Sequence, residues 1–295
     1  MSDATFVSDH DILVFVPNRG CLEVVSVFDE ELLRRDSLAI VARFHLPALR
    51  SDFTYADPVM WGRQILGSSG DGIAIATARV RRGLLLDAFD IVVRIPDLLR
   101  DAHKRWNTSC GIPEASWRDW GPAYAYMFNH GVIDTIALSI SGYRLARSAP
   151  LVFGDEDLDG PSCVYVLDFN PKTTARALQE GEHNVYTELS RTRVGFSLLG
   201  LTTPPVGEAR SCLVTGSYPR HRAGSPFADD IRALGPLRVT MRSYPTRFST
   251  AVLDEDHLIA MASILSLFMA STDRPKSVFQ KVDGSQEAVG SIYSL

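Results

Sequence analysis

The sequence predicts a mainly β fold: a degenerate β-propeller, or a propeller-like stack of antiparallel sheets with a few short helices. Short apolar and β-branched runs recur at intervals of roughly 8 to 20 residues, with turn residues between them. Residues 237–242 alternate apolar and polar side chains, as a half-buried strand does. The helical patterns are few and too short for the crossover helices of a parallel α/β protein.

The first predicted hairpin joins residues 12–16 to residues 22–27 through Pro17-Asn18-Arg19-Gly20. Asn and Gly both tolerate the positive φ that a tight turn requires. No strict internal period follows, so the number of propeller blades stays open. Further strands are expected at residues 39–46, 73–80, 90–95, 124–128, 136–140, 164–169, 185–189, 194–201, 212–215, 237–242 and 248–253.

The clearest helix signal covers residues 173–180. Asn170 is a good N-cap, Pro171 suits the first helical position, and Gly181 is typical of a C-terminal end. Ser225-Pro226 and Gly235 repeat this arrangement. A second helix is therefore expected at residues 229–234. A third is expected at residues 97–106.

Composition limits the class of protein. The 295 residues are 45% apolar and 22% charged, which is typical of a globular chain. Thirty basic against 35 acidic residues give a formal charge of −5, which disfavours a nucleic-acid or membrane-surface binder. We expect a single β-rich domain over residues 1–270, followed by a frayed tail at residues 271–295.

Targeting signals are not found in this sequence. Residues 1–10 lack a signal-peptide pattern. The longest apolar run, residues 258–270, is shorter than the roughly 20 residues of a spanning helix. We therefore expect an intracellular protein, cytoplasmic or nuclear, without a membrane partner.

The four cysteines and seven histidines are scattered rather than paired. Zinc sites usually draw two ligands from one turn or hairpin. We therefore expect no metal and no cofactor, and we expect reduced, mostly buried cysteines. The cysteines are Cys21, Cys110, Cys163 and Cys212.

Three local patterns were weighed as ligand sites. Asp155, Asp157 and Asp159 open like a calcium loop, but Val166 stands where that loop needs a bidentate carboxylate. The glycine-rich residues 67–72 lack the Gly-Lys-Ser/Thr of a phosphate-binding loop. Residues 254–257 carry three carboxylates beside an imidazole, on a predicted hairpin tip. We expect an acidic turn, a connector and a solvated tip, respectively.

Aromatic side chains gather in the middle of the chain. Exposed tryptophans make good binding anchors, so Trp106, Trp117 and Trp120 are the candidate binding residues. In the alternative arrangement Tyr124, Tyr126 and Phe128 stack in the core, and the tryptophans hold a loop over it. No catalytic residue is assigned, because neither a nucleophile elbow nor a His-Glu-x-x-His motif occurs.

Several strings resemble the β-rich C-terminal regions of F-box-like proteins of basidiomycete fungi. They are residues 117–123, rich in tryptophan and containing Gly-Pro, Ser141-Gly142-Tyr143-Arg144, the strand end Tyr165-Val166-Leu167-Asp168-Phe169-Asn170-Pro171, and residues 252–259. The resemblance implies a propeller-like module that recognises a protein partner for a cullin-based ubiquitin ligase. The F-box itself, with its Leu-Pro-x-Glu-Leu-like opening, is not found, and residues 30–33 are too short to replace it. The resemblance therefore extends to the recognition half alone.

These observations predict a non-enzymatic protein-interaction module, the substrate-recognition part of an F-box-like adaptor. One alternative is a hydrolase-type enzyme on a β-propeller or barrel, whose dispersed histidines and carboxylates converge in a pocket. Another is a divergent duplicate that folds but has lost its partner. An interaction module predicts instead an exposed apolar patch without convergent titratable groups.

Overall fold

A computed structural model describes most of the chain. The residues described are 2–27, 39–62, 72–109, 111–129, 139–150, 162–182, 184–188, 204–218, 225–244, 250–253, 257–261 and 290–294. The predicted strand at residues 194–201 and the acidic turn at residues 155–160 lie outside these ranges. So do most of residues 67–72 and the tip at residues 254–256.

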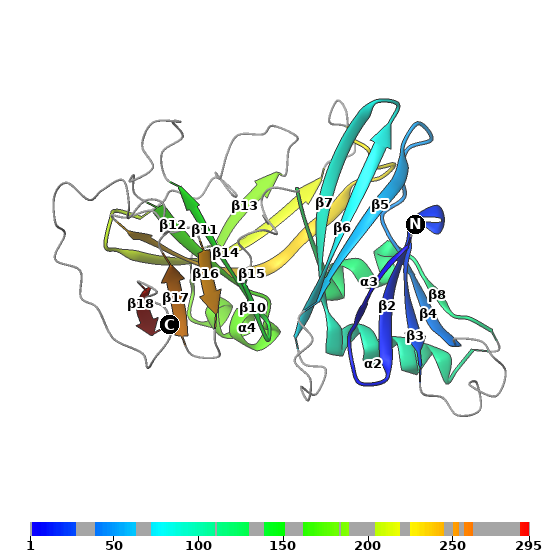
Figure 1. Ribbon diagram of the computed structural model, residues 1–295, viewed down its shortest axis with the longest axis horizontal. Coiled ribbons are helices and arrows are strands. Elements are labelled where there is room, and N and C mark those ends of the chain that lie inside the picture. Colours follow the sequence, from blue (N-terminus) through cyan, green and yellow to red (C-terminus); the bar gives the residue numbers. More distant parts are fainter. Residues whose placement is uncertain are drawn as a thin grey trace, which may run out of the picture. The chain divides into compact units, whose positions relative to one another are not determined.

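The fold is mainly β, as predicted, and the strands of the described residues form four sheets (Figure 1). A five-stranded sheet is ordered β1 (Asp3–Phe6), β2 (Asp11–Val16), β3 (Cys21–Ser26), β4 (Ala39–His45), β8 (Glu114–Ala115). A four-stranded sheet is ordered β5 (Thr54–Gly62), β6 (Ile73–Arg82), β7 (Leu85–Arg94), β9 (Ala125–Asn129). A six-stranded sheet is ordered β10 (Ser139–Ser141), β11 (Arg144–Pro150), β12 (Ser162–Asp168), β15 (Ile231–Tyr244), β14 (Ala209–Tyr218), β13 (Asn184–Glu188). A three-stranded sheet is ordered β16 (Thr250–Leu253), β17 (His257–Met261), β18 (Gly290–Ser294).

The sequence predicts one domain over residues 1–270. In the structure the chain divides into two compact units. Unit 1 comprises Met1–Ile133, Asn184–Gly200 and Val214–Leu237, and unit 2 comprises Asp134–His183, Leu201–Leu213 and Arg238–Leu295. The expected tail, residues 271–295, contains β18, which pairs with β17.

The predicted first hairpin is confirmed. Strands β2 and β3 pair antiparallel around the short 3-10 helix η1 (Pro17–Arg19), and Gly20 closes the turn at φ +58°. A side chain at this position would be strained by that φ, and its Cβ would lie 3.0 Å from the Tyr55 ring. Glycine is therefore required here, and it sets the register of the sheet.

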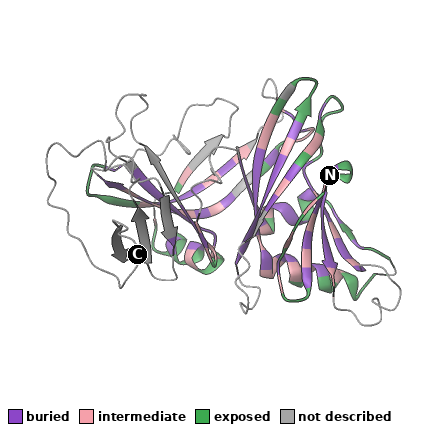
Figure 2. Ribbon diagram, in the orientation of Figure 1, coloured by how far each residue is buried: buried purple, intermediate pink, exposed green. Residues whose placement is uncertain are grey.

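One face of the five-stranded sheet is buried in rows that cross its strands. Leu13, Val24 and Ala42 form one row, and Phe15, Leu22 and Phe44 form the next; all six are fully buried. Burial alternates along β2, as Figure 2 shows, because successive side chains of a strand point to opposite faces.

Two α-helices lie in the described part of unit 1. The predicted helix at residues 97–106 is confirmed as α2 (Ile95–Trp106), which buries Leu98 and Ala102 and contacts β4 and β7. The second, α3 (Trp117–Tyr124), begins at Ser116, whose side chain and that of Asp119 form a capping box. This hydrogen-bonding to Ser116 lowers the pKa of the Asp119 carboxyl.

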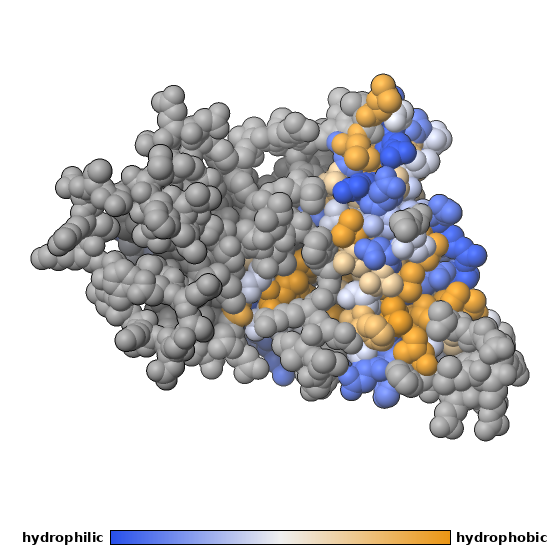
Figure 3. Space-filling model, viewed as in Figure 1, coloured by the Kyte–Doolittle hydropathy of each residue, from blue (hydrophilic) through white to orange (hydrophobic). Residues whose placement is uncertain are grey.

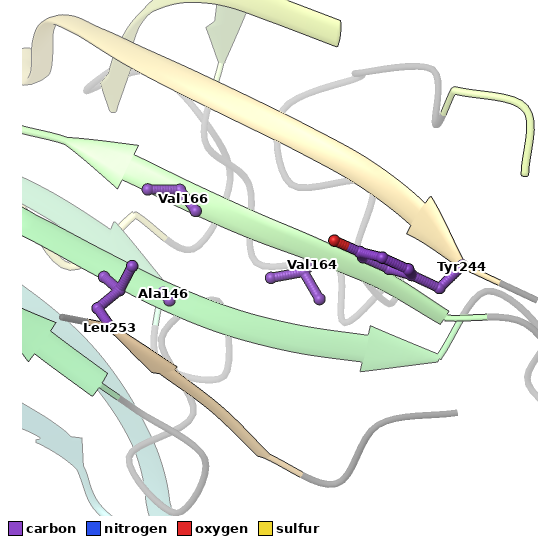
Figure 4. Close-up of a cluster of buried hydrophobic side chains, with 5 residues drawn as sticks. All are labelled: Ala146, Val164, Val166, Tyr244 and Leu253. Carbon is purple, nitrogen blue, oxygen red and sulfur yellow. The ribbon is translucent and has the colours of Figure 1, made fainter. Parts of the chain in front are cut away.

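In unit 2 the helix signal at residues 173–180 is confirmed. Helix α4 (Pro171–Gln179) begins at Asn170, whose side-chain oxygen accepts the N–H of Lys172 at 3.0 Å. A small apolar cluster packs between β11, β12, β15 and β16 (Figure 4); it consists of Ala146, Val164, Val166, Tyr244 and Leu253. The N–H of Leu253 also donates to Ser139 Oγ at 2.8 Å.

The predicted helix at residues 229–234 is wrong, because Ile231–Tyr244 forms the long strand β15. Six residues make fewer than two helical turns, and so short a helix is marginal by itself. Residues 231–234 form the first part of β15, a strand that lies between β12 and β14 in the six-stranded sheet, and Ile231 is buried. Tertiary pairing therefore overrides the local capping signal.

No membrane-spanning candidate is found among the helices of the described ranges, since none combines sufficient length with sufficient apolar character.

Gly121 of α3 offers a test of this packing. A Cβ at this position would lie 2.4 Å from the Trp117 indole, which is buried and rigid. Gly121→Ala should therefore lower the free energy of unfolding by about 1–3 kcal/mol, measured by urea denaturation. Gly111→Ala, where a Cβ meets nothing within 4 Å, is the control and should change it by less than about 0.5 kcal/mol. Equal effects of the two substitutions would contradict this account of α3.

Candidate functional site

The structure separates the three candidate tryptophans. Trp106, at the C-terminal end of α2, is 37% exposed, whereas Trp117 and Trp120 of α3 are buried. Trp120 is edge-on to Phe44, with ring centroids 5.4 Å apart, and edge-on to Trp117 at 5.0 Å. Its Nε1–H donates to the backbone oxygen of His45 at 2.8 Å.

Trp117 and Trp120 thus attach α3 to β4 and are not presented to a partner. In the alternative arrangement the tryptophans hold a loop over a core of Tyr124, Tyr126 and Phe128; Trp117 and Trp120 lie instead in helix α3, and Tyr124 is only partly buried. Tyr126 and Phe128 of β9 are also buried. Of the three candidates, only Trp106 keeps substantial exposed surface.

A row of charged side chains crosses the five-stranded sheet on the face opposite Phe44. Glu23, Arg43 and Glu114 occupy matching positions on β3, β4 and β8. Arg43 Nε donates to Glu23 Oε1 at 2.7 Å, and its Nη1 donates to Glu114 Oε1 at 3.1 Å. His45 Nε2 lies 3.1 Å from Glu114 Oε2.

Mutual pairing stabilises the charged forms in this row. The hydrogen bond to Glu23 raises the pKa of Arg43, and hydrogen bonds from His45 and then Arg43 lower the pKa of Glu114. Burial, reinforced by Glu23, raises the pKa of the neighbouring Cys21 thiol to about 11. At neutral pH this thiol is protonated and is not a nucleophile.

Ser8, Asp11 and His103 come together at the start of β2. Ser8 Oγ donates to Asp11 Oδ2 at 2.9 Å, and His103 Nε2 lies 3.4 Å from the same oxygen. A catalytic triad needs the serine to face the imidazole, with the carboxylate behind it. Here the hydroxyl faces the carboxylate, and Ser8 Oγ also accepts the N–H of Asp11 at 2.9 Å, so the group stabilises a turn.

The convergence that a hydrolase would need is not seen in the described ranges. His103 and His45 each meet one carboxylate, in separate places. No three metal-ligating side chains gather in that part of the chain. Cys21, Cys163 and Cys212 are buried, free thiols there, and burial raises the pKa of each. His130 and His183 lie outside these ranges.

The most exposed apolar group of the described residues lies at the end of the β6–β7 hairpin. Arg82 pairs with Leu85, so the loop is only Gly83 and Leu84. Gly83 has φ +56°, the first central position of a two-residue hairpin turn of type II′ character. Leu84 is fully exposed and Leu86 half exposed. Figure 3 shows hydrophobic atoms at this end, with hydrophilic atoms beside them.

Charged pairs surround this apex. Arg81 Nη2 donates to Asp57 Oδ2 at 3.1 Å, and Arg82 Nε lies 2.9 Å from Asp52 Oδ2. The guanidinium of Arg82 also lies over the Phe53 ring, 5.4 Å from its centroid. We call Leu84 and Leu86 together with these two ion pairs the hairpin tip. It combines an apolar centre with a polar rim.

The sequence does not predict the hairpin tip, because the predicted strands cover residues 73–80 and 90–95 and the residues between them carry no assignment. A usable signal was present: Arg81-Arg82-Gly83-Leu84-Leu85-Leu86 places a turn glycine between arginines and leucines. Hairpin turns normally carry polar residues beside the glycine, so leucines there stand out.

Comparison of the chain with family models, with curated proteins and with solved structures yields no match. The function is therefore argued from the side chains themselves.

The different placement of the tryptophans can be measured. Trp120→Ala should lower the free energy of unfolding by about 3–5 kcal/mol, because it removes a buried ring and its hydrogen bond. Trp106→Ala should change it by less than about 1 kcal/mol. Chemical denaturation followed by circular dichroism measures both. Similar losses for the two variants would show that Trp120 is not the structural anchor described here.

The charged row predicts a pH-dependent stability. Because folding lowers the pKa of Glu114, its ionised form stabilises the fold above the ordinary value of 4.5, and this is lost as the pH falls through the lowered value. Glu114 is about half exposed, so Glu114→Gln should cost less than about 1 kcal/mol at pH 7.

The difference in the free energy of unfolding between wild type and Glu114→Gln should become smaller as the pH falls below 4.5. Urea unfolding at pH 7, 5 and 3 measures this difference. Glu208→Gln, at an exposed site of unit 2, is the control without such a gap. A gap that stays constant down to pH 3 would contradict the assigned role of Glu114.

Proposed function

We propose that the chain is a non-enzymatic protein-interaction module. The observation that carries this proposal is the hairpin tip, where Leu84 is fully exposed at the apex of two long paired strands. Exposed apolar groups with a polar rim are typical of protein-binding surfaces. Loops held by a rigid sheet are also where binding residues concentrate.

The pairing of charged groups supports a binding role over catalysis. The carboxylates of Asp11, Glu23 and Glu114 each interact with a neighbouring side chain of the same unit. Catalytic groups are usually gathered in one concave site with their pKa values tuned for proton transfer. The described histidine–carboxylate contacts instead lie apart and join neighbouring elements of unit 1.

In its finer form the proposal is that this module is the substrate-recognition part of an F-box-like ubiquitin-ligase adaptor, with a degenerate propeller-like stack of sheets. Its support is the resemblance of the strings noted in the sequence, of which Tyr165-Val166-Leu167-Asp168-Phe169-Asn170-Pro171 is the most specific. In the structure this string ends β12 and begins α4.

Affinity purification of the tagged full chain from its native cells, followed by quantitative mass spectrometry, tests the proposal. We expect a reproducible partner protein that is enriched over an unrelated protein with the same tag. Ligase adaptor and cullin subunits among the enriched proteins would support the finer form. The absence of any reproducible partner would overturn the proposed function, as would turnover of hydrolase substrates by the purified chain.

A further inference from the structure

We infer that the hairpin tip is a peg that enters an apolar pocket on a folded protein partner, a pocket whose rim carries charges of both signs. This inference rests on the proposed function and names the surface and the class of partner. Five features of the tip support it: its turn, its rim, the backbone at Asp57, its local charge and its size.

The turn does not need leucine. A two-residue hairpin loop needs a residue that tolerates positive φ, and Gly83 supplies it at +56°. The next position accepts polar residues such as Asn or Ser equally well. Leu84 is fully exposed, so folding gains no burial from its side chain. The fold therefore does not account for a leucine at the apex, whereas contact with a partner does.

The rim is held in place by ion pairs. Arg81 and Asp57 are each about half exposed, as is Arg82, and Asp52 is 40% exposed. The pairs fix the long arginine side chains beside the leucines and leave both signs of charge accessible. A partner rim that offers both donors and acceptors can therefore bind without separating either pair.

The backbone at Asp57 is strained. Asp57 has φ +38°, and no other non-glycine residue of the described ranges has positive φ. It lies in the irregular stretch of β5 between Ala56 and Val59, where the register with β6 shifts. This conformation brings the Asp57 carboxylate to Arg81 at the tip. Strained backbone often occurs at binding sites, where position matters more than stability.

The local charge disfavours two other classes of partner. The charged residues of the hairpin between positions 79 and 88, together with the two ion-pair partners, are three arginines and three aspartates, so their net formal charge is zero; they are Arg79, Arg81, Arg82, Asp87, Asp52 and Asp57. Anionic lipid surfaces and nucleic-acid backbones attract an excess of positive charge. A protein pocket of mixed polarity imposes no such requirement.

The size of the apolar centre indicates a peg. One full and one half-exposed leucine cover far less than the roughly 800 Å² that each partner buries in a standard protein interface. A flat contact of this size would be weak. Inserted into a pocket, the same two side chains become the buried centre of a larger interface whose outer part is polar.

Site-specific photocrosslinking in native cells tests the inference. A diazirine amino acid replaces Leu84 in the full chain, and in a control it replaces Leu178 of α4, which is half exposed. We expect position 84 to crosslink a discrete protein that position 178 does not. Crosslinking of neither position, or of both to the same protein, would overturn the inference.

Binding to the purified, crosslinked protein is then measured with variants. Leu84→Ser/Leu86→Ser should weaken the affinity at least about tenfold, and Leu178→Ser should leave it unchanged. Circular dichroism should show equal thermal unfolding for all three proteins, because none of the leucines is buried. Unchanged affinity of the double variant would overturn the inference.

Two further measurements test the two other occupants of the tip, a membrane surface and a second copy of the chain. Co-sedimentation with phosphatidylcholine–phosphatidylserine vesicles that is lost in Leu84→Ser/Leu86→Ser would assign the tip to a membrane surface instead. Crosslinking of position 84 to a second copy, with a dimer in light scattering, would assign it to self-association. Either outcome overturns the inference.

The proposed function and the inference fail differently. If affinity purification recovers the same partners with the wild type and with Leu84→Ser/Leu86→Ser, the chain binds proteins through another surface and only the inference fails. If neither protein recovers a partner, the proposed function fails as well.

Discussion

The contact between the Trp120 ring and Phe44 is the constraint on which the first unit depends. It places α3 on the five-stranded sheet, and the hydrogen bond from the Trp120 indole to the His45 backbone fixes the helix along β4. Phe44 continues a buried row with Phe15 and Leu22, and at the other end of this row Phe15 lies edge-on to Tyr55 of β5. Without a large ring here, Phe44 would lose the contact that joins its end of the row to α3.

The same constraint determines where the charges lie. Once Phe44 points to the helices, strand alternation directs Arg43 and His45 to the opposite face. Glu23 and Glu114 stand beside Arg43 on the neighbouring strands, so its charge is balanced from both sides. The pairs of Arg43 and His45 with Glu114 join β8 to β4, and the pair of Arg43 with Glu23 joins β4 to β3.

Regular apolar strand patterns and local turn and cap signals could be predicted from the sequence, whereas the outcome where a local signal competes with distant pairing could not. The turn at Gly20 and the cap at Asn170 involve only near neighbours, and both are confirmed. Residues 229–234 carry an equally good capping pattern, but pairing within the sheet makes them a strand. Strand β5 was not predicted, because Pro58 and the irregular pairing beside it break the strand pattern.

The candidate site shows the same limit. Composition indicates that the tryptophans matter, but their burial depends on α3 meeting β4, which are more than 70 residues apart in the chain. The unassigned hairpin tip became visible only when the exposure of each leucine was known. Whether a tryptophan or leucine is a binding residue or a core residue therefore depends on the surroundings of its side chain, which no local sequence pattern encodes.

The two-residue loop at Gly83 allows the residue at the hairpin apex to change during evolution. Because the turn takes its geometry from the glycine alone, the following position is free to change without disturbing the ten-residue strands that carry it. A single codon change there would alter the apex shape while preserving the scaffold. Related chains could thus acquire new specificities by small steps, each of them tolerated by the fold.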